Sequence, residues 1–232
     1  SKINLKDIRK KLKNNGINTT GLSSQSLKYK FEQYNGKSPT RKVYKDIKQL
    51  GIKGKDGRVF LVKTKNGKSF AKKQFRSNKS TKDMLREITL QKEAAKADIA
   101  PMIKEFDLNS KFIIMTLLED SLYAIMKKKH GKLTKKYQKD ILRIFSNLDK
   151  IGIFHKDPNP LNFLVDNSRK LFIIDFGFAE RIVPEKHGKQ PNRNQMTLGL
   201  LIKFKILFPN CEYPVLKNSL PQPLQQILDN KN

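Results

Sequence analysis

The sequence has one cysteine, Cys211, among its 232 residues. A single cysteine forms no intramolecular disulfide and no cysteine-rich zinc site, which excludes the disulfide-rich and zinc-finger classes. It also leads us to expect a reducing, intracellular compartment. No apolar run is long enough to span a membrane, because the longest near the C-terminus, residues 198–208, contains Lys203 and Lys205. No signal-peptide pattern is visible, so we expect a protein that is not secreted.

Acidic residues are scarce, with 21 Asp and Glu against 49 Lys and Arg, which gives a formal net charge of +28. This excess favours polyanionic partners, or solubility in a crowded particle. The 37% hydrophobic content is enough for a core, and the length fits one compact domain with a small appendage. We find no internal repeats.

Two motifs carry most of the chemical information. The pattern H-x-D-x-x-x-x-N contains Asp157 and Asn162, and D-F-G begins at Asp175 after an apolar strand. Phosphoryl transfer uses one carboxylate to orient the attacking hydroxyl, one amide oxygen on a metal ion, and a second carboxylate on the metal ions that bridge the ATP phosphates. Each motif alone is common in loops. Together, at this spacing, they resemble the catalytic centre of the protein-kinase superfamily.

That resemblance assigns roles to the three residues. Asp157 would be the catalytic base, and Asn162 and Asp175 would bind Mg²⁺, with ATP as the phosphoryl donor. The acceptor would be a serine or threonine hydroxyl of a protein substrate. Two alternatives remain open, a catalytically weak kinase fold that serves as a scaffold and a small-molecule kinase.

Residues 51–59 resemble the kinase glycine-rich loop, G-x-G-x-x-G-x-V. Gly54, Gly57 and Val59 fit this pattern, and Gly51 comes one residue too early. Glycines there would let backbone N–H groups approach the phosphates of ATP. The alternative is an ordinary hairpin with an Asp-Gly turn.

Residues 58–62 and 69–75 read as two strands around a turn at Asn66-Gly67. Strand alternation puts Ala71 and Lys73 on one face and Lys72 on the other. The segment resembles the kinase V-A-I-K strand, which implies that Ala71 covers the adenine and that Lys73 reaches the α- and β-phosphates. A register shifted by one residue would give that role to Lys72.

Residues 84–95 have helical periodicity and resemble the kinase helix whose glutamate pairs with the strand lysine. Glu87 would then pair with Lys73. Glu93 is a second candidate, and a surface Glu87 in an i,i+4 charge pattern is the third reading. The expected apolar face of this helix consists of Leu85, Ile88, Leu90 and Ala94.

Residues 111–115 form an apolar strand that leads into residues 116–119, which resemble the kinase hinge. Met115 would be the gatekeeper, or simply a core methionine, and the hinge around Leu117 would bind adenine. Helices are expected at 121–129 and 133–151, the second one ended by Gly152. Its inward residues would be Ile141, Leu142, Ile144, Phe145 and Leu148.

The resemblance covers about residues 45–182 and implies an α+β, bilobal, minimal kinase fold. The N-lobe would span residues 45–118, and a reduced C-lobe would span residues 119–232, since only 55 residues follow Gly177. The composition and the catalytic loop resemble small kinases of giant DNA viruses. This implies a location in the host cytoplasm or the virion, and it leaves the oligomeric state open.

Three departures from the family pattern bear on activity and control. Serine/threonine kinases usually have a lysine, which contacts the transferred phosphate, where this chain has Asn159. Lys156 replaces an arginine that receives an activation-loop phosphate in many kinases. Residues 178–196 contain no Ser, Thr or Tyr, so no phosphate can order this segment. In this the chain resembles the minimal Bud-thirty-two group.

Residues 1–45 carry 12 Lys and Arg and 2 Asp and Glu. Within residues 1–36, a first helical stripe of Leu5, Ile8 and Leu12 is followed by a break and by a second stripe of Leu27 and Phe31. The pattern resembles the SAP nucleic-acid-binding motif, which Ile8, Leu12, Gly16, Ile17 and Gly21 fit. The second helix is displaced by one residue, so a basic hairpin that only packs on the N-lobe is the alternative. Non-specific nucleic acid is therefore a candidate partner of this appendage.

Overall fold

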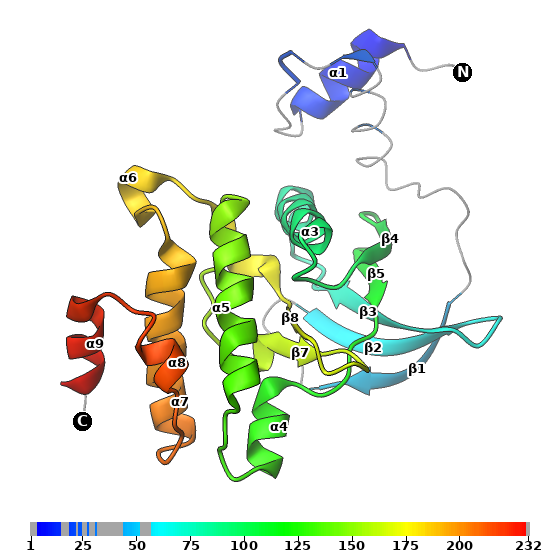
Figure 1. The fold of residues 1–232 in the computed structure, drawn as a ribbon. Coiled ribbons are helices and arrows are strands. Elements are labelled where there is room, and N and C mark those ends of the chain that lie inside the picture. The colour runs from blue at the N-terminus through cyan, green and yellow to red at the C-terminus, as the bar shows by residue number, and fades with distance from the viewer. Residues whose placement is uncertain are drawn as a thin grey trace. The chain divides into compact units, whose positions relative to one another are not determined.

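A computed structural model describes residues 4–14, 19–21, 23, 24, 27, 31, 44–51 and 57–230. The chain divides into two compact units. The sheet unit consists of Ser1–Ile88 and Ile103–Leu117, and the helical unit consists of Thr89–Met102 and Leu118–Asn232. Strands concentrate in the first unit and helices in the second (Figure 1). This confirms the predicted α+β class with a strand-rich and a helix-rich part.

The sheet unit is built on one antiparallel sheet in the order β1-β2-β3-β5-β4. Its strands are β1 (Tyr44–Leu50), β2 (Gly57–Thr64), β3 (Ser69–Phe75), β4 (Ile103–Asp107) and β5 (Phe112–Thr116). The predicted turn between β2 and β3 is present, with the Gly67 N–H donating to the Thr64 carbonyl at 2.9 Å. Gly67 has φ +75°, which glycine adopts without strain.

One face of this sheet packs against α3 (Thr81–Lys96). Side chains alternate along β3, so Ala71, Lys73 and Phe75 are buried. Ala71 and Phe75 share a hydrophobic cluster with Met84 and Ile88 of α3. Leu85 packs against this cluster as predicted but is only partly buried, whereas Met84, which the prediction left out, is fully buried. The helix turns about 100° per residue, so a shift of one position moves the side chain to the edge of that face.

The helical unit contains the predicted helices α4 (Leu122–Lys128) and α5 (Lys135–Lys150). The Ser121 hydroxyl accepts from the Ala124 N–H and the Thr134 hydroxyl from the Tyr137 N–H, so both helices begin at an N-cap. Next come β6 (Ile153–Phe154), η1 (Pro160–Asn162), β7 (Phe163–Val165), β8 (Leu171–Ile173), η2 (Phe176–Phe178), β9 (Glu180–Arg181) and α6 (Pro184–His187). The π-helical turn η3 (Asn192–Met196) leads into α7 (Thr197–Leu207), α8 (Pro214–Lys217) and α9 (Gln222–Asp229).

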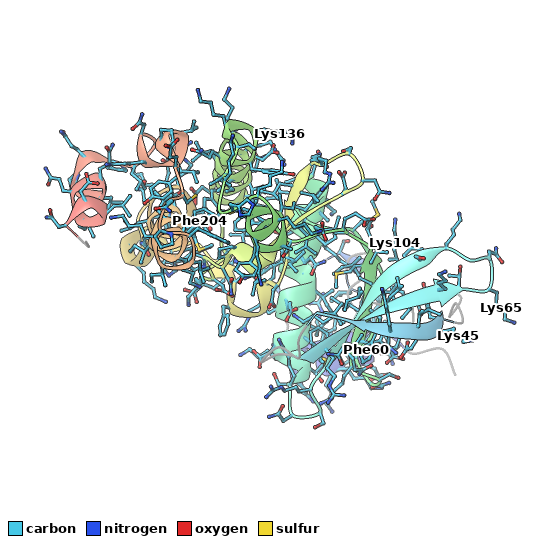
Figure 2. The ribbon with its side chains drawn as sticks, turned by 90° about the horizontal axis from the view of Figure 1, so that it is seen from below. Lys45, Phe60, Lys65, Lys104, Lys136 and Phe204 are labelled. Atoms are coloured by element: carbon cyan, nitrogen blue, oxygen red, sulfur yellow. The ribbon has the colours of Figure 1, made fainter. Side chains whose placement is uncertain are left out.

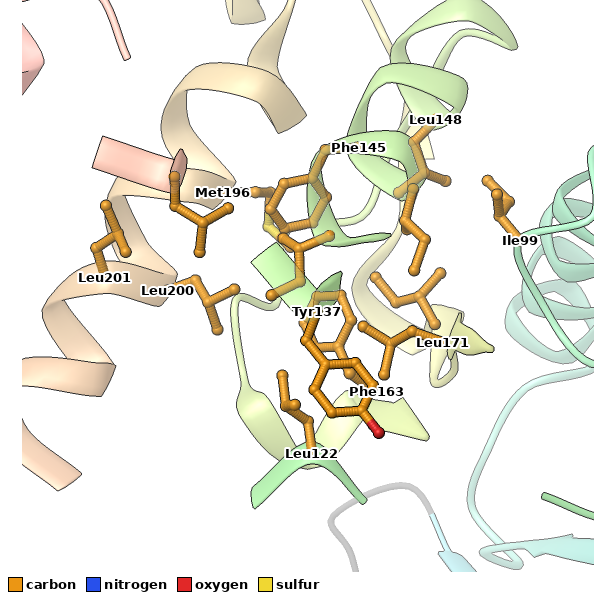
Figure 3. Packing of buried hydrophobic residues seen from close by; sticks show 14 of the residues in the cluster. Ile99, Leu122, Tyr137, Phe145, Leu148, Phe163, Leu171, Met196, Leu200 and Leu201 are labelled. Carbon is orange, nitrogen blue, oxygen red and sulfur yellow. The ribbon is translucent and has the colours of Figure 1, made fainter. Parts of the chain in front are cut away.

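The core of this unit fixes the β7–β8 hairpin against α5 (Figure 3). Ile141, Ile144, Phe145 and Leu148 are fully buried, as predicted, whereas Leu142 is only partly buried. The rings of Phe145 and Phe163 meet edge to face with centroids 5.8 Å apart. Burying each such side chain contributes roughly 1.5–3 kcal/mol, so this packing holds the hairpin rigidly in place.

In the N-terminal segment, α1 (Leu5–Asn14) buries Ile8 and Leu12 with Leu27 and Phe31. Leu5 is 37% exposed, so the predicted stripe is shorter by one residue. Gly16 and Ile17 lie outside the described residues, and Gly21 has φ +70°.

Lysine side chains extend outward from both units, for example Lys45 on β1, Lys65 in the turn after β2, and Lys136 on α5 (Figure 2). Among the described residues, no helix is both long and apolar enough to cross a membrane.

Candidate active site

In the sheet unit, a buried ion pair joins Lys73 of β3 to Glu87 of α3. The Lys73 Nζ lies 2.5 Å from the Glu87 Oε1, and the two side chains are 9% and 1% exposed. Lys72, on the opposite face, pairs instead with Asp46 at 3.2 Å. The structure therefore has the register in which Lys73, not Lys72, meets the helix glutamate.

Glu87 also holds a second lysine. The Lys79 Nζ lies 2.6 Å from the Glu87 Oε2 and its side chain is 9% exposed. Lys79 belongs to the loop between β3 and α3, and Lys111 donates to the carbonyl of Lys79 at 3.0 Å and to that of Ser77. One buried carboxylate thus balances two ammonium groups, and both of its oxygens are engaged.

The predicted adenine-binding residues share the face of the sheet that carries Lys73. Val59 pairs with Lys73, and Ala71 pairs with Met115. Ala71 and Met115 are each 8% exposed, and Val59 and Leu117 pack at the border of the same cluster. These apolar side chains would suit a flat aromatic base.

Gly57 begins β2, and a Cβ there would lie 2.1 Å from the carbonyl oxygen of Gln74. Only glycine fits, because the backbones of β2 and β3 approach too closely for a side chain. The second predicted glycine, Gly54, lies outside the described residues.

In the helical unit, the catalytic-loop motif forms a tight turn around Asp157. The Asn162 Nδ2 donates to the Asp157 Oδ2 at 2.8 Å. The turn η1 begins with Pro160, and the side chain of Asn159 accepts from the Leu161 N–H at 3.0 Å. The Asn162 amide nitrogen is used in the hydrogen bond to Asp157, so the Asn162 Oδ1 is the atom that could bind a metal ion. The residue is only 7% exposed.

The β7–β8 register brings the second predicted metal ligand beside the first. Phe163 pairs with Ile173, and the next N–H, that of Ile174, donates to the Asn162 carbonyl at 2.9 Å. Asp175 follows directly at the same end of the hairpin. Its φ of +67° is in the left-handed region, which is costly for a non-glycine residue and typical of functional sites. Asn162 and Asp175 offer the oxygen ligands that Mg²⁺ prefers.

His155 is a structural member of this loop. It is fully buried, its Nε2 lies 3.0 Å from the Ile174 carbonyl, and its ring packs edge-on against Phe176 at 5.0 Å. Burial lowers the pKa of His155 below its ordinary value, and this outweighs the opposing effect of the Asp175 charge. A neutral His155 that donates from Nε2 ties the catalytic loop to the D-F-G segment.

Asn192, at the start of η3, anchors the catalytic loop from a distant part of the sequence. Its Oδ1 accepts from the His155 N–H at 3.1 Å, and its Nδ2 donates to the Ile153 carbonyl and to the Asp149 Oδ1, both at 2.7 Å. Asp149 also accepts from the backbone N–H groups of Asn192 and Arg193. Burial raises the pKa of Asp149, and these hydrogen bonds partly counter the rise.

Glu180 of β9, in the segment after D-F-G, contacts two lysines and one histidine. Its carboxylate lies 3.2 Å from the Lys156 Nζ, 3.2 Å from the Lys186 Nζ and 2.8 Å from the His187 Nε2. Desolvation raises the pKa of Glu180, but the hydrogen bonds from Lys156 and Lys186 outweigh it and leave the pKa below its ordinary value. Lys156 thus pairs with a carboxylate of this chain.

The sequence matches the profile of the protein kinase domain over residues 44–199, about two thirds of the chain. The chain belongs to the protein kinase domain family. Human cGMP-dependent protein kinase 2 is 29% identical over 169 residues, a match that covers 67% of this chain and 22% of that kinase. The Saccharomyces cerevisiae serine/threonine-protein kinase RIM15 is 26% identical over 177 residues, which cover 70% of this chain and 10% of that kinase.

A further match is the probable serine/threonine-protein kinase BUD32 homolog of Archaeoglobus fulgidus, which is 26% identical over 103 residues. That match covers 42% of this chain and 51% of the homolog. The match therefore spans about a fifth of the length of the human cGMP-dependent kinase and about half of the length of the Archaeoglobus homolog.

Glu93, the second candidate for the partner of Lys73, forms a bidentate pair with Arg181 at 2.6 and 2.7 Å instead. Sequence reasoning missed Lys79, Glu180 and Asn192 around this kinase site. Lys79 and Glu180 carry no motif that sets them apart from the other charged residues of the chain. Asn192 follows Pro191 just before an apolar helix, which is the one local signal that a buried anchor could begin there.

Proposed function

We propose that this chain transfers the γ-phosphoryl group of ATP to a serine or threonine hydroxyl of a protein substrate, with Mg²⁺ as cofactor. The observation that carries the proposal is the orientation of Asp157, whose Oδ2 is held by the Asn162 amide at 2.8 Å. A carboxylate fixed by one oxygen keeps the other available to orient a hydroxyl and accept its proton.

Each predicted residue has a role that its surroundings support. Lys73, held by buried Glu87, would bind the α- and β-phosphates. Asn162 and Asp175 would hold Mg²⁺, which when bound neutralises the charge of the phosphates. The described residues contain no group of three or more His, Cys, Asp or Glu side chains that could hold a metal ion. Two protein ligands suit Mg²⁺, which usually completes its shell with substrate phosphates and water.

The alternatives of a scaffold and of a small-molecule kinase are less well supported. A scaffold has no physical need for a buried Lys73–Glu87 pair, which costs desolvation, or for a left-handed Asp175. Asn159 permits a small-molecule acceptor, but the serine/threonine-protein kinase relatives favour a protein.

The predictions of a nucleic-acid partner and of a location stay predictions. Non-specific nucleic acid is proposed as a partner of residues 1–36 on the basis of their positive charge. A viral origin, and with it the host cytoplasm or the virion, is proposed from the composition and catalytic loop alone.

The test is magnesium-dependent ATP turnover by the whole chain, measured alone and with basic proteins, acidic proteins and nucleic acid added. Asp175→Asn should abolish magnesium-dependent nucleotide binding and leave the circular dichroism spectrum unchanged, because asparagine also tolerates a left-handed backbone. Asp157→Asn should keep nucleotide binding and lose turnover. Wild-type turnover in Asp157→Asn, or unchanged magnesium-dependent affinity in Asp175→Asn, would refute the assigned roles.

A further inference from the structure

Helix α7 approaches the catalytic loop very closely at Gly199. A Cβ at this position would lie 2.7 Å from the Cγ of Pro158, the residue that follows Asp157. Glycine inside a helix costs about 1 kcal/mol relative to alanine. Its presence here is explained by the contact, because the proline ring is rigid and could not move aside. The helix surface around Gly199 therefore faces the catalytic loop.

Lys203 lies four residues after Gly199, so it is on the same face of α7, one turn further along. Its Nζ is 3.7 Å from the Asp157 Oδ1. The Lys203 side chain is 39% exposed and that of Asp157 is 23% exposed. Both groups can therefore be reached by a substrate.

The two oxygens of Asp157 have different surroundings. Oδ2 accepts the short hydrogen bond from Asn162, whereas Lys203 is near Oδ1 at a distance too long for a hydrogen bond. Oδ1 can thus receive the acceptor hydroxyl while the ammonium stays beside it. A phosphoryl group attacked by that hydroxyl would pass within reach of the same ammonium.

We propose that Lys203 is a catalytic residue whose ammonium contacts the phosphoryl group during transfer, a task that Asn159 cannot perform because its side chain is neutral and caps η1. In the step, the hydroxyl oxygen forms a bond to the γ-phosphorus, and the bond from that phosphorus to the β–γ bridging oxygen breaks. The hydroxyl proton passes to Asp157, and ADP leaves with the bonding electron pair. Lys203 stays protonated and stabilises the charge on the transferred group.

This inference rests on the proposed function, and three variants of the full-length chain test it. Lys203→Met should lower kcat roughly 10²-fold, the effect of removing one preorganised charge partner, with the KM for ATP changed less than about 2-fold. Lys203→Arg should recover most of the loss because it restores the charge. Lys139→Met, which removes an exposed lysine of α5, is the matched control and should behave like the wild type.

The outcomes separate the two proposals. If Asp157→Asn is inactive but Lys203→Met keeps a kcat within about 3-fold of the wild type, only the role of Lys203 fails. If Lys203→Met and Lys203→Arg are equally impaired, the lysine acts through shape rather than charge and the inference is overturned. If Asp157→Asn itself turns over ATP normally, the proposed function fails first.

Discussion

The carboxylate of Glu87 balances two nearly buried lysines, so the stability of the sheet unit should be sensitive to its loss. Its side chain is 1% exposed, and those of Lys73 and Lys79 are 9% exposed. Glu87→Gln keeps the shape but removes the negative charge. Removing one partner of a buried ion pair typically costs about 3–5 kcal/mol, since the opposite charge stays buried. We expect a loss of unfolding free energy in this range.

The lysine variants should be milder, and this difference is the sharper test. Lys73→Met leaves Glu87 paired with Lys79 at 2.6 Å, so no buried carboxylate is left alone. The expected cost is that of one hydrogen bond to a charged group, about 1.5–3 kcal/mol. Lys79→Met should cost a similar amount, whereas the double variant should lose more than the sum of both single losses, because only then is Glu87 unpaired.

Urea unfolding followed by far-ultraviolet circular dichroism measures these differences, with the midpoint reporting stability and the slope checking that the transition itself is unchanged. Lys63→Met, which removes an exposed lysine of β2, is a suitable control. The reasoning is refuted if Lys73→Met destabilises as much as Glu87→Gln, or if the losses of the double lysine variant are additive.

Three further predictions concern pH, control and nucleic acid. Burial lowers the pKa of His155, so the unfolded state binds the proton first as the pH falls below about 6.5, and the unfolding free energy should drop by up to about 1.4 kcal/mol per pH unit. Urea midpoints measured between pH 7.5 and 5.5 should show this drop. The same pH dependence of stability in His155→Gln would contradict the prediction. Phosphatase treatment should leave the rate unchanged, because residues 178–196 hold no hydroxyl and Glu180 already pairs with Lys156; a large loss of rate would show control elsewhere. Nucleic-acid affinity should reside largely in residues 1–36, and its logarithm should fall by about 0.7–0.9 per phosphate contact per log unit of salt. A chain that begins at Pro39 and binds nucleic acid as tightly as the full chain would argue against the role of residues 1–36.

Local patterns were enough to predict the elements that carry the site. Alternation along residues 69–75 predicted the buried face with Lys73, and helical periodicity predicted the long helix that ends at Lys150. These signals are local because a strand or an amphipathic helix repeats its apolar side chains at a fixed interval. The spacing of Asp157, Asn162 and Asp175 has a similar local basis, since a short hairpin separates Asn162 from Asp175, and their catalytic and metal-binding roles stay predictions.

The sequence by itself therefore determined the kinase family and the strands and helices that carry the motifs, because each depends on neighbours within a few positions. It did not predict β1, β4 or the helices α6 to α9. Only the tertiary structure showed that Glu87 holds Lys79 as well as Lys73, and that Asn192 anchors the loop at His155. Only the structure brought Lys203 to Asp157. These pairs are 8 to 46 positions apart and follow no period, so packing decides which of these side chains meet.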